Sequence, residues 1–231
     1  MGMNMLKKKA LQLIERQLAK SGTVLEVRSW SPSTFYEVDL HLPGVDMSKW
    51  TSVQHMKTKV AEYVYRDYTP ASWDEETGTC TLYIDAAHDG EGSRWVSSLR
   101  KGDQICYLGI AGTNARPVDG KRIVCLGDSS CVGHFLALEQ LAGKGNVSGA
   151  LVIKEESHRR EFASYFDTLL EAIPQQLNSN IDNLHNWLKE QQWGSNAVYI
   201  AGNVPMVVEL KKIIRNLPDF DGAVKVQGFW W

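Results

Sequence analysis

The sequence lacks an excess of charge of either sign. Its 231 residues contain 25 lysines and arginines against 27 acidic residues, which gives a formal net charge of −2. Proteins that bind nucleic acid neutralise many phosphates and therefore carry a surplus of positive charge. The charge balance argues against nucleic acid as a partner.

Cysteine is also scarce, and no C-x-x-C pair occurs. The four cysteines are Cys80, Cys106, Cys125 and Cys131, and three of them lie in apolar runs that are typical of buried strands. Closely spaced cysteines hold zinc and iron–sulfur centres, whereas disulfides form in oxidising compartments. The spacing therefore predicts no metal site within this chain and indicates a reducing compartment.

Long apolar runs are absent. No segment approaches the roughly 18 consecutive apolar residues of a membrane-spanning helix, and the amino terminus lacks the apolar stretch and cleavage site of a secretory signal. We expect a soluble cytoplasmic protein with no membrane span. The length suits two domains of about 110 residues each, although one large domain also fits.

The first half of the chain has the pattern of a β-rich domain. Residues 5–20 place apolar side chains at helical spacing among lysines, which predicts a surface helix. A second short helix is predicted over residues 93–99. Short apolar runs bounded by turn residues predict strands, at residues 24–30, 36–42, 53–65, 79–86 and 104–110. Such strands suggest a small antiparallel barrel or sandwich over residues 1–117.

Beyond Pro117 the pattern changes to strands that alternate with helices. Strands are predicted at residues 122–126, 147–153, 196–201 and 223–227, and helices at residues 132–141, 159–166, 181–191 and 207–214. This alternation is typical of a doubly wound parallel sheet, which binds ligands beyond the carboxyl ends of its strands. We therefore assign residues 118–231 to an α/β domain.

A first candidate binding motif is Arg66-Asp67-Tyr68-Thr69, at the end of an apolar run. An arginine can pair with a phosphate, and a tyrosine ring can lie flat on a planar heterocycle. Alternation along a strand sends Arg66 and Tyr68 to the same side, where one ligand could meet both. An exposed arginine beside an ordinary strand tyrosine explains these residues equally well.

The segment from His88 to Trp95 is a glycine-containing loop that leads directly into a predicted helix. Free backbone N–H groups and the helix dipole at such a start favour an anionic pyrophosphate. Ser93 could instead be an ordinary N-cap.

Together and in this order, the two motifs resemble those of the siderophore-interacting protein family, a branch of the ferredoxin-reductase-like flavoproteins. That family pairs an Arg-x-Tyr-Thr/Ser strand with a His-Gly-x-Gly-x-x-Ser-Arg-Trp-Ala-like loop. The loop here is compact and lacks the proline that the family often has. The resemblance extends over nearly the whole chain, from Val24 to Trp231. It implies an FAD-binding barrel followed by a nicotinamide-binding α/β domain.

The resemblance implies a role for each matching residue of the first domain. Arg66 would hold the FAD phosphates, Tyr68 would stack on the isoalloxazine ring, and Thr69 would reach its N5 region. The remaining residues would wrap the pyrophosphate and adenylate side of the cofactor: Gly92, Ser93 and Trp95, with His88 nearby.

The second domain contributes further matches. Gly127, Asp128 and Ser129 stand where the family has a Gly-Asp-Glu-Thr-Ala-Leu-Pro-Ala-like stretch, at a predicted strand-to-helix turn. Here Val132-Gly133-His134 replaces the usual Leu-Pro, which leaves the docking of the dinucleotide open. Gly202 lies in the late strand-to-turn segment that approaches the nicotinamide in this superfamily. On the pattern alone, the first of these stretches would be a capped turn.

The carboxyl-terminal Gly-Phe-Trp sequence matches the end of the family core. Phe229 is predicted to lie at the domain interface, while Trp230 could cover the flavin or pack in a strand end. A basic docking surface for an anionic ferric siderophore is expected near the flavin, with Lys57, Lys59 and Arg94 as candidates. Each of the three could equally be a solvated charge.

The function implied by the resemblance is an FAD-dependent ferric-siderophore reductase that takes electrons from NADPH or NADH and releases Fe(II). Cations at residues 154 and 158–160 slightly favour NADPH, while Glu155 and Glu156 oppose it. A reduced ferredoxin is an alternative donor. Two other functions stay open: an NAD(P)H–flavin oxidoreductase with another acceptor, and a binding protein for siderophore or flavin without turnover.

Overall fold

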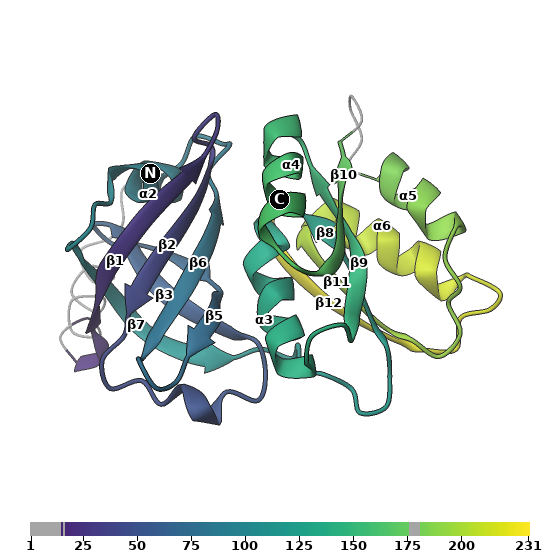
Figure 1. Ribbon diagram of the computed structural model, residues 1–231, viewed down its shortest axis with the longest axis horizontal. Coiled ribbons are helices and arrows are strands. Elements are labelled where there is room, and N and C mark those ends of the chain that lie inside the picture. Colours follow the sequence, from purple (N-terminus) through teal and green to yellow (C-terminus); the bar gives the residue numbers. More distant parts are fainter. Residues whose placement is uncertain (1–14, 16, 176–180) are drawn as a thin grey trace.

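Two halves of different architecture lie side by side in the computed structural model, a β-barrel and an α/β half (Figure 1). The structure describes residue 15 and residues 17–175 and 181–231. The helix predicted over residues 5–20 lies mostly outside the described residues. Among those that are described, no helix is both long and apolar enough to cross a membrane.

The barrel is a seven-stranded sheet in which every neighbouring pair is antiparallel. Its order is β4-β3-β7-β1-β2-β6-β5. The strands are β1 (Lys20–Trp30), β2 (Phe35–His41), β3 (Gln54–Ala61), β4 (Val64–Tyr68), β5 (Pro70–Asp74), β6 (Thr79–Asp85) and β7 (Gln104–Gly112). A 3-10 turn, η1 (Met47–Lys49), precedes β3, and the helix α2 (Glu91–Ser98) follows β6.

The prediction of a single strand over residues 53–65 is wrong, because the chain reverses direction within this segment. Tyr63 has a φ of 60°. Residues other than glycine seldom adopt this left-handed backbone conformation, which is typical of a turn. β3 and β4 therefore form a hairpin, in which Thr58 faces Arg66 and Met56 faces Tyr68. The turn places Arg66 and Tyr68 on the end strand of the sheet.

The α/β half has a five-stranded parallel sheet in the order β10-β9-β8-β11-β12. Its strands are β8 (Ile123–Asp128), β9 (Val147–Ile153), β10 (Leu169–Pro174), β11 (Ala197–Asn203) and β12 (Ala223–Trp230). The connecting elements are a 3-10 turn η2 (Ser129–Cys131), α3 (Val132–Ala142), α4 (Glu156–Tyr165), α5 (Asp182–Lys189) and α6 (Val204–Arg215).

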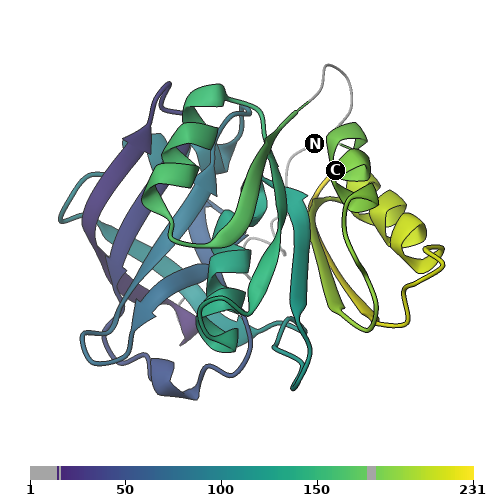
Figure 2. The ribbon, with the colours of Figure 1, turned by 45° about the vertical axis from the view of Figure 1, so that its right-hand side comes forward.

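Helices cover both faces of this parallel sheet. Figure 2 shows α3 and α4 between the sheet and the barrel, with α5 and α6 on the other side. Along β8 the side chains alternate accordingly: Cys125 packs on the barrel side, while Val124 and Leu126 pack on the α5–α6 side. The predicted antiparallel barrel followed by a doubly wound parallel sheet is confirmed.

One buried hydrophobic cluster spans both halves, and each half also has a cluster of its own. Trp30 and Phe35 of the barrel belong to the same buried cluster as Phe135 of α3 and Phe162 of α4. The ring of Trp30 lies 5.9 Å from that of His158 on α4. The boundary predicted between residues 117 and 118 falls in the segment between β7 and β8 and stays a prediction, because packing is continuous across the interface.

Candidate functional site

Arg66 lies exposed on β4 without an ion pair to any described residue. Its guanidinium Nη1 donates to the carbonyl oxygen of Tyr65 at 2.8 Å. The adjacent acid, Asp67, is instead paired with Lys57 across the hairpin at 2.8 Å. The guanidinium of Arg66 is therefore free to take a ligand phosphate.

Gly92, in the first turn of α2, brings the start of that helix against β4. A Cβ atom on Gly92 would lie 2.7 Å from the Tyr68 hydroxyl oxygen and 3.6 Å from Cγ of Arg66. The first distance is too short for any side chain, so only glycine allows this approach. It also confirms that Arg66 and Tyr68 lie on the same side of β4.

The start of α2 has hydrogen-bonding groups without protein partners. The N-cap residue, Gly90, has no side chain to cap the helix. The hydroxyl of Ser93 is buried and has no hydrogen-bond partner in the described part of the chain. Buried polar groups are nearly always hydrogen-bonded, and a helix start attracts anions. The residues present therefore fit the diphosphate of a dinucleotide such as FAD.

Arg66 and the start of α2 at Gly92 and Ser93 are called the phosphate cradle below. Two aromatic rings lie beside it. Tyr68 and Trp95 are stacked, with ring centroids 5.5 Å apart and planes inclined by 14°. Burial raises the pKa of Tyr68 to about 12, so its phenol stays neutral at physiological pH. Sequence reasoning assigned the two rings to opposite ends of the cofactor, whereas the structure brings them into contact. His88 is exposed in the preceding loop, and its Cδ2 would lie 3.8 Å from a Cβ on Gly90.

A second group of predicted residues meets at the carboxyl ends of β8 and β11, where the strand order of the parallel sheet reverses. Such a switch point is the usual ligand site of a doubly wound sheet. One oxygen of Asp128 accepts from the Ser130 amide at 3.0 Å, and the other accepts from the Asn203 amide at 2.8 Å. Gly202 approaches so closely that a Cβ would lie 2.5 Å from the Asp128 carboxylate.

Asp128 thus ties the two strand ends together. Burial raises the pKa of its carboxyl, and both oxygens are already engaged with the protein. Gly127 is equally confined, because a Cβ there would lie 2.8 Å from the carbonyl oxygen of Ala201. These residues shape the switch point, while Ser129 faces the barrel.

Contacts between the barrel and α3 join the two groups. The hydroxyl of Ser129 donates a hydrogen bond to the carboxylate of Asp85, at the end of β6. A Cβ on Gly133 would lie 3.4 Å from the carbonyl oxygen of Thr69. Sequence reasoning missed Asp85, although its position just before the His88 loop is a usable signal. Thr69 therefore lies where the first group meets the second domain.

The carboxyl-terminal aromatic residues border the same region. The ring of Phe229 lies 5.4 Å from that of His134 on α3, a contact between β12 and the first turn of α3. Trp230 is paired in register with Asn203 at the switch point and is about half exposed. A cover over the flavin by Trp230 stays a prediction.

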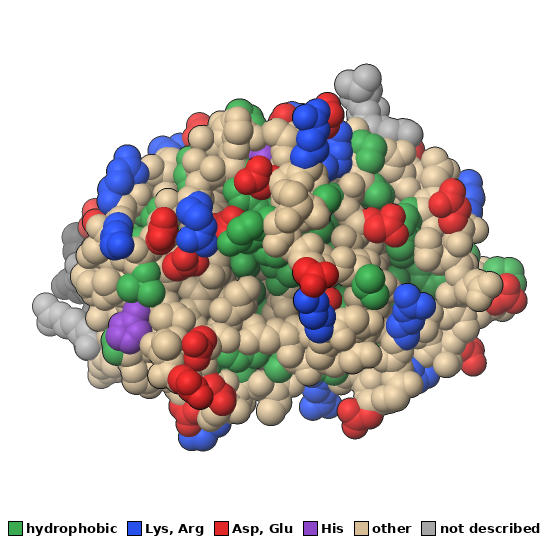
Figure 3. Space-filling view, in the orientation of Figure 1, with side chains coloured by type: hydrophobic (Ala, Val, Ile, Leu, Met, Phe, Trp, Pro, Cys, Tyr) green, Lys and Arg blue, Asp and Glu red, His purple; other side chains and the backbone are tan. Residues whose placement is uncertain are grey.

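Each of the three cations predicted to dock a substrate is paired with an acidic residue. Lys57 pairs with Asp67, and Lys59 pairs with Glu15 at 3.0 Å. Arg94 pairs with Asp89 and Glu91. On the face shown in Figure 3, basic and acidic side chains are interspersed. The role of these cations in substrate docking stays a prediction. Each would have to break an ion pair to bind an anionic chelate.

No group of three or more potential metal ligands occurs among the described residues. All four cysteines are free thiols. Burial raises the pKa of Cys125 and of Cys131 well above the ordinary value, so these thiols stay protonated at neutral pH and are poor nucleophiles.

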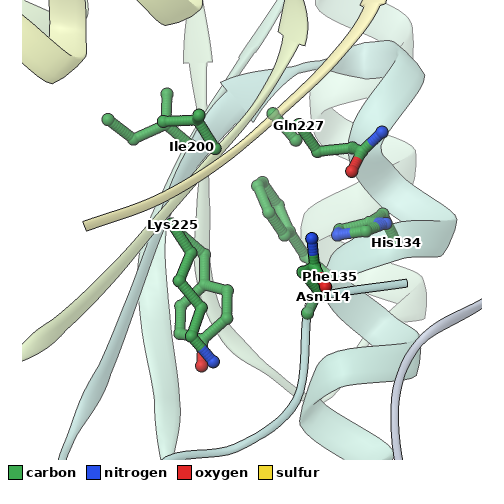
Figure 4. Close-up of a pocket in the computed structure, with 10 residues that line it drawn as sticks. Asn114, His134, Phe135, Ile200, Lys225 and Gln227 are labelled. Carbon is green, nitrogen blue, oxygen red and sulfur yellow. The ribbon is translucent and has the colours of Figure 1, made fainter. Parts of the chain in front are cut away.

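A cavity of about 210 Å³ lies where the linker between the halves meets α3, β11 and β12 (Figure 4). His134 lines it and is 2 % exposed. Its imidazole has no hydrogen bond to any residue that the structure describes. Burial lowers the pKa of His134 to about 4, so the ring is neutral at physiological pH.

The buried His134 predicts a loss of stability in mild acid. Below pH 6.5 the unfolded chain binds a proton at this position, whereas the folded protein binds it only near pH 4, so stability falls as the pH decreases between these values. The full effect is about 3 kcal/mol. Lys225 is the charged side chain that lines the same cavity. We expect His134→Phe to unfold with a flatter pH dependence from 6.5 to 4 in urea titrations, and an unchanged slope would contradict the prediction.

Part of the barrel matches a known family model. Residues 27–115 match the model of the oxidoreductase FAD-binding domain. This range contains both the Arg66–Thr69 strand and the loop that leads into α2. No curated protein sequence matches the chain.

Solved structures with the same architecture share little sequence with the chain. The siderophore-interacting protein of Acinetobacter baumannii is 13% identical with a TM-score of 0.73, over 92% of this chain and 90% of that one. SipS, a siderophore-interacting protein of Aeromonas hydrophila, is 14% identical with a TM-score of 0.68, over 92% and 91%.

A third similar structure is the ferredoxin–NADP+ reductase of Plasmodium falciparum with 2′P-AMP, which is 12% identical with a TM-score of 0.61, over 90% of this chain and 96% of that one. At these identities the likeness concerns the fold. Residues 27–115 are thus similar to an oxidoreductase FAD-binding domain, and the fold of the chain is like that of the siderophore-interacting protein and the ferredoxin–NADP+ reductase described above.

Proposed function

We propose that this protein is an FAD-dependent reductase that passes electrons from NADPH or NADH to a ferric siderophore in the cytoplasm. The observation that carries the proposal is the phosphate cradle. Arg66 has no ion pair with a described residue, the start of α2 has no side-chain cap, and the hydroxyl of Ser93 is buried without a partner in the part of the chain that the structure describes. These features support the binding of an anion at the start of α2.

The chain's own residues would hold and orient the cofactor. The Arg66 guanidinium and the first turn of α2 would bind the diphosphate, and Tyr68 would present a neutral ring to the cofactor's aromatic system. Bound FAD supplies the redox chemistry, since it takes up a hydride and gives out single electrons. Thr69 and Gly133 lie at the junction where the flavin ring would meet the second domain.

The switch point formed by β8 and β11 is the proposed docking place for the nicotinamide dinucleotide. Asp128 holds the two strand ends together through the amides of Ser130 and Asn203. The hydrogen bond from Ser129 to Asp85 connects this end of the sheet to the barrel. This connection would hold the donor and the flavin in one rigid arrangement, as hydride transfer requires.

A ferric siderophore is the proposed acceptor because of the structural relatives and the chemistry of the metal. Two of the similar structures are siderophore-interacting proteins. Oxygen ligands hold ferric iron tightly because the ion is hard and highly charged, and one added electron weakens each bond. Reduction would therefore release the metal as Fe(II).

The experiment that tests the proposal is the visible spectrum of the purified protein with FAD, before and after an excess of NADPH or NADH. We expect flavin absorption at about 450 nm. This absorption should bleach on reduction and recover when a ferric siderophore is added. A flavin that stays oxidised would support a binding protein without turnover. Reoxidation only by free flavin or a redox protein would support a reductase with another acceptor, and reduction only by ferredoxin would replace the nicotinamide donor.

In this proposal, the preference for NADPH or NADH depends on the cations at the carboxyl end of β9. Lys154 is exposed there, and the Arg159 guanidinium lies close by, because it donates to the carbonyl oxygen of Lys154 at 2.7 Å. His158 was grouped with these cations from the sequence, yet it is buried against Trp30 and Phe35. It is therefore not available to a nucleotide phosphate.

We expect Lys154→Ala to lower the preference for NADPH over NADH by about fivefold to tenfold, because one cation near a 2′-phosphate is lost. The measurement is kcat/KM for both cofactors. Lys189→Ala, on α5, is the matched control and should leave the ratio unchanged. An unaltered ratio in the Lys154 variant would place the 2′-phosphate elsewhere.

A further inference from the structure

The cavity between the linker, α3 and the β11–β12 edge has features of a binding site that the phosphate cradle and the switch point do not use. Its walls contain the rings of Phe135 and Tyr199 and the small side chains of Ala115 and Ala201. Asn114 and Gln227 add two neutral amide groups. In Figure 4, the side chains of Asn114, Gln227 and His134 lie on one side of the cavity, and Lys225 lies on the other.

His134 is the strongest sign that the cavity takes a ligand. The imidazole is almost fully buried, and its two nitrogens have no protein partner among the residues that the structure describes. Its ring contacts are apolar, with Phe135 and Phe229 at 5.8 and 5.4 Å. Because the ring lines the cavity, a ligand there has an imidazole donor and acceptor within reach.

The cavity lining includes one cationic side chain, Lys225, and no acidic residue among those described. The Lys225 ammonium donates to the carbonyl oxygen of Arg116 at 3.1 Å and lies 5.1 Å from the centre of the Tyr199 ring. Neither Lys225 nor Arg116 forms an ion pair with a described acidic residue, and no acidic side chain lines the cavity. Desolvation and the charge of Arg116 lower the pKa of Lys225. An anion beside the ammonium would oppose both effects, because a nearby negative charge favours the protonated form of Lys225.

The size of the cavity limits the occupant to a small molecule or a single group. Its volume, about 210 Å³, lies below the roughly 300–1,000 Å³ of pockets for drug-sized ligands. The aromatic and small apolar walls favour a flat ring, and the amides and imidazole favour a hydrogen-bonding edge.

From the Lys225 ammonium, the buried imidazole of His134 and the aromatic walls, we infer that this cavity binds a small planar aromatic carboxylate. The carboxylate meets Lys225 at the cationic side. The ring lies against Phe135, and its far edge reaches His134 and the amides. The inference does not depend on the flavin, because none of these residues belongs to the phosphate cradle.

The test is isothermal titration calorimetry of the full chain with 4-hydroxybenzoate and three comparators. We expect 4-hydroxybenzoate to bind saturably, and 4-hydroxybenzamide, benzoate and 4-hydroxycyclohexanecarboxylate each to bind at least about tenfold more weakly. The benzamide removes the charge, benzoate removes the hydrogen-bonding edge, and the cyclohexane compound removes the planar ring. If any comparator binds as tightly as 4-hydroxybenzoate, or if 4-hydroxybenzoate does not bind, the inference is overturned.

Two variants locate the bound carboxylate. Lys225→Met should weaken the binding of 4-hydroxybenzoate at least about tenfold, while the matched control Lys212→Met, on α6, should leave it unchanged. An unaffected Lys225 variant would overturn the inference. The comparison of ligands on the unaltered protein stands even if that variant fails to fold. Flavin absorbance and its bleaching by NAD(P)H, recorded on the same samples, report separately on the proposed function.

Discussion

Arg66→Ala is expected to weaken FAD binding by about tenfold to a hundredfold. A hydrogen bond to a charged group contributes about 1.5–3 kcal/mol, and each 1.4 kcal/mol changes affinity by about tenfold. The Arg66 side chain passes Gly92 at the start of α2, where its Cγ would lie 3.6 Å from a Cβ, and its guanidinium has no acidic partner among the described residues. Its whole interaction with the diphosphate is therefore lost. Affinity is measured by titrating FAD into apoprotein and following flavin fluorescence.

Lys57→Ala is the matched control, because Lys57 is an exposed cation on the adjacent strand that is already paired with Asp67. We expect it to change FAD affinity by no more than about twofold. Arg66→Lys keeps the charge but cannot form a planar bidentate contact, so its affinity should be intermediate. Equal affinities of the Ala variants at positions 57 and 66 would show that the diphosphate does not lie on β4.

Trp30→Ala is expected to lower the free energy of unfolding by about 3–5 kcal/mol and to destabilise both halves together. The ring is 3 % exposed and lies 4.6 Å from that of Phe35. It also contacts His158 of α4, so the lost packing affects the interface of the two halves. A protein of ordinary stability has only about 5–15 kcal/mol in all.

A second loss adds to the lost packing. Nε1 of Trp30 donates to Glu37 at 2.6 Å, and Glu37 is also nearly fully buried. The alanine variant leaves this carboxylate with fewer donors, although Arg28 still reaches it at 3.0 Å. Trp30→Phe keeps a ring and removes the N–H group, so it should cost about 1–3 kcal/mol.

The measurement is urea unfolding followed by tryptophan fluorescence and by far-ultraviolet circular dichroism. A buried cluster that spans both halves predicts one transition with coincident midpoints. Trp231→Ala is the control, because that side chain is 90 % exposed, and it should change stability by no more than about 0.5 kcal/mol. Two separate transitions in the unaltered protein would contradict a common core.

Most strands and helices could be predicted from local periodicity, because each depends on residues close together in the chain. β5 and β10 were missed for the same reason. β5 contains Ser72 at a φ of 47° and an irregular register with β6, so it has no regular alternation. β10 is short and ends in proline, which reads as a turn. Neither strand has a local pattern strong enough to predict it.

The phosphate cradle was predictable in part. The order of an arginine-bearing strand and a glycine loop before a helix was sufficient to choose Arg66, Gly92 and Ser93. The stacking of Tyr68 on Trp95 was not predictable, because it depends on how closely Gly92 lets α2 approach β4. That distance is a property of packing between elements, and no pattern within either element specifies it.

The amino-acid sequence was enough to establish two halves of different type and the motif residues of an FAD-binding barrel, since periodicity, turn residues and charge are local properties. The interface followed only from folding. Burial of His158 against Trp30, the hydrogen bond of Ser129 to Asp85 and the cavity at His134 each join residues far apart in the chain. Such contacts depend on how whole elements pack, and a side chain exposed by its local pattern can be buried by a neighbouring domain.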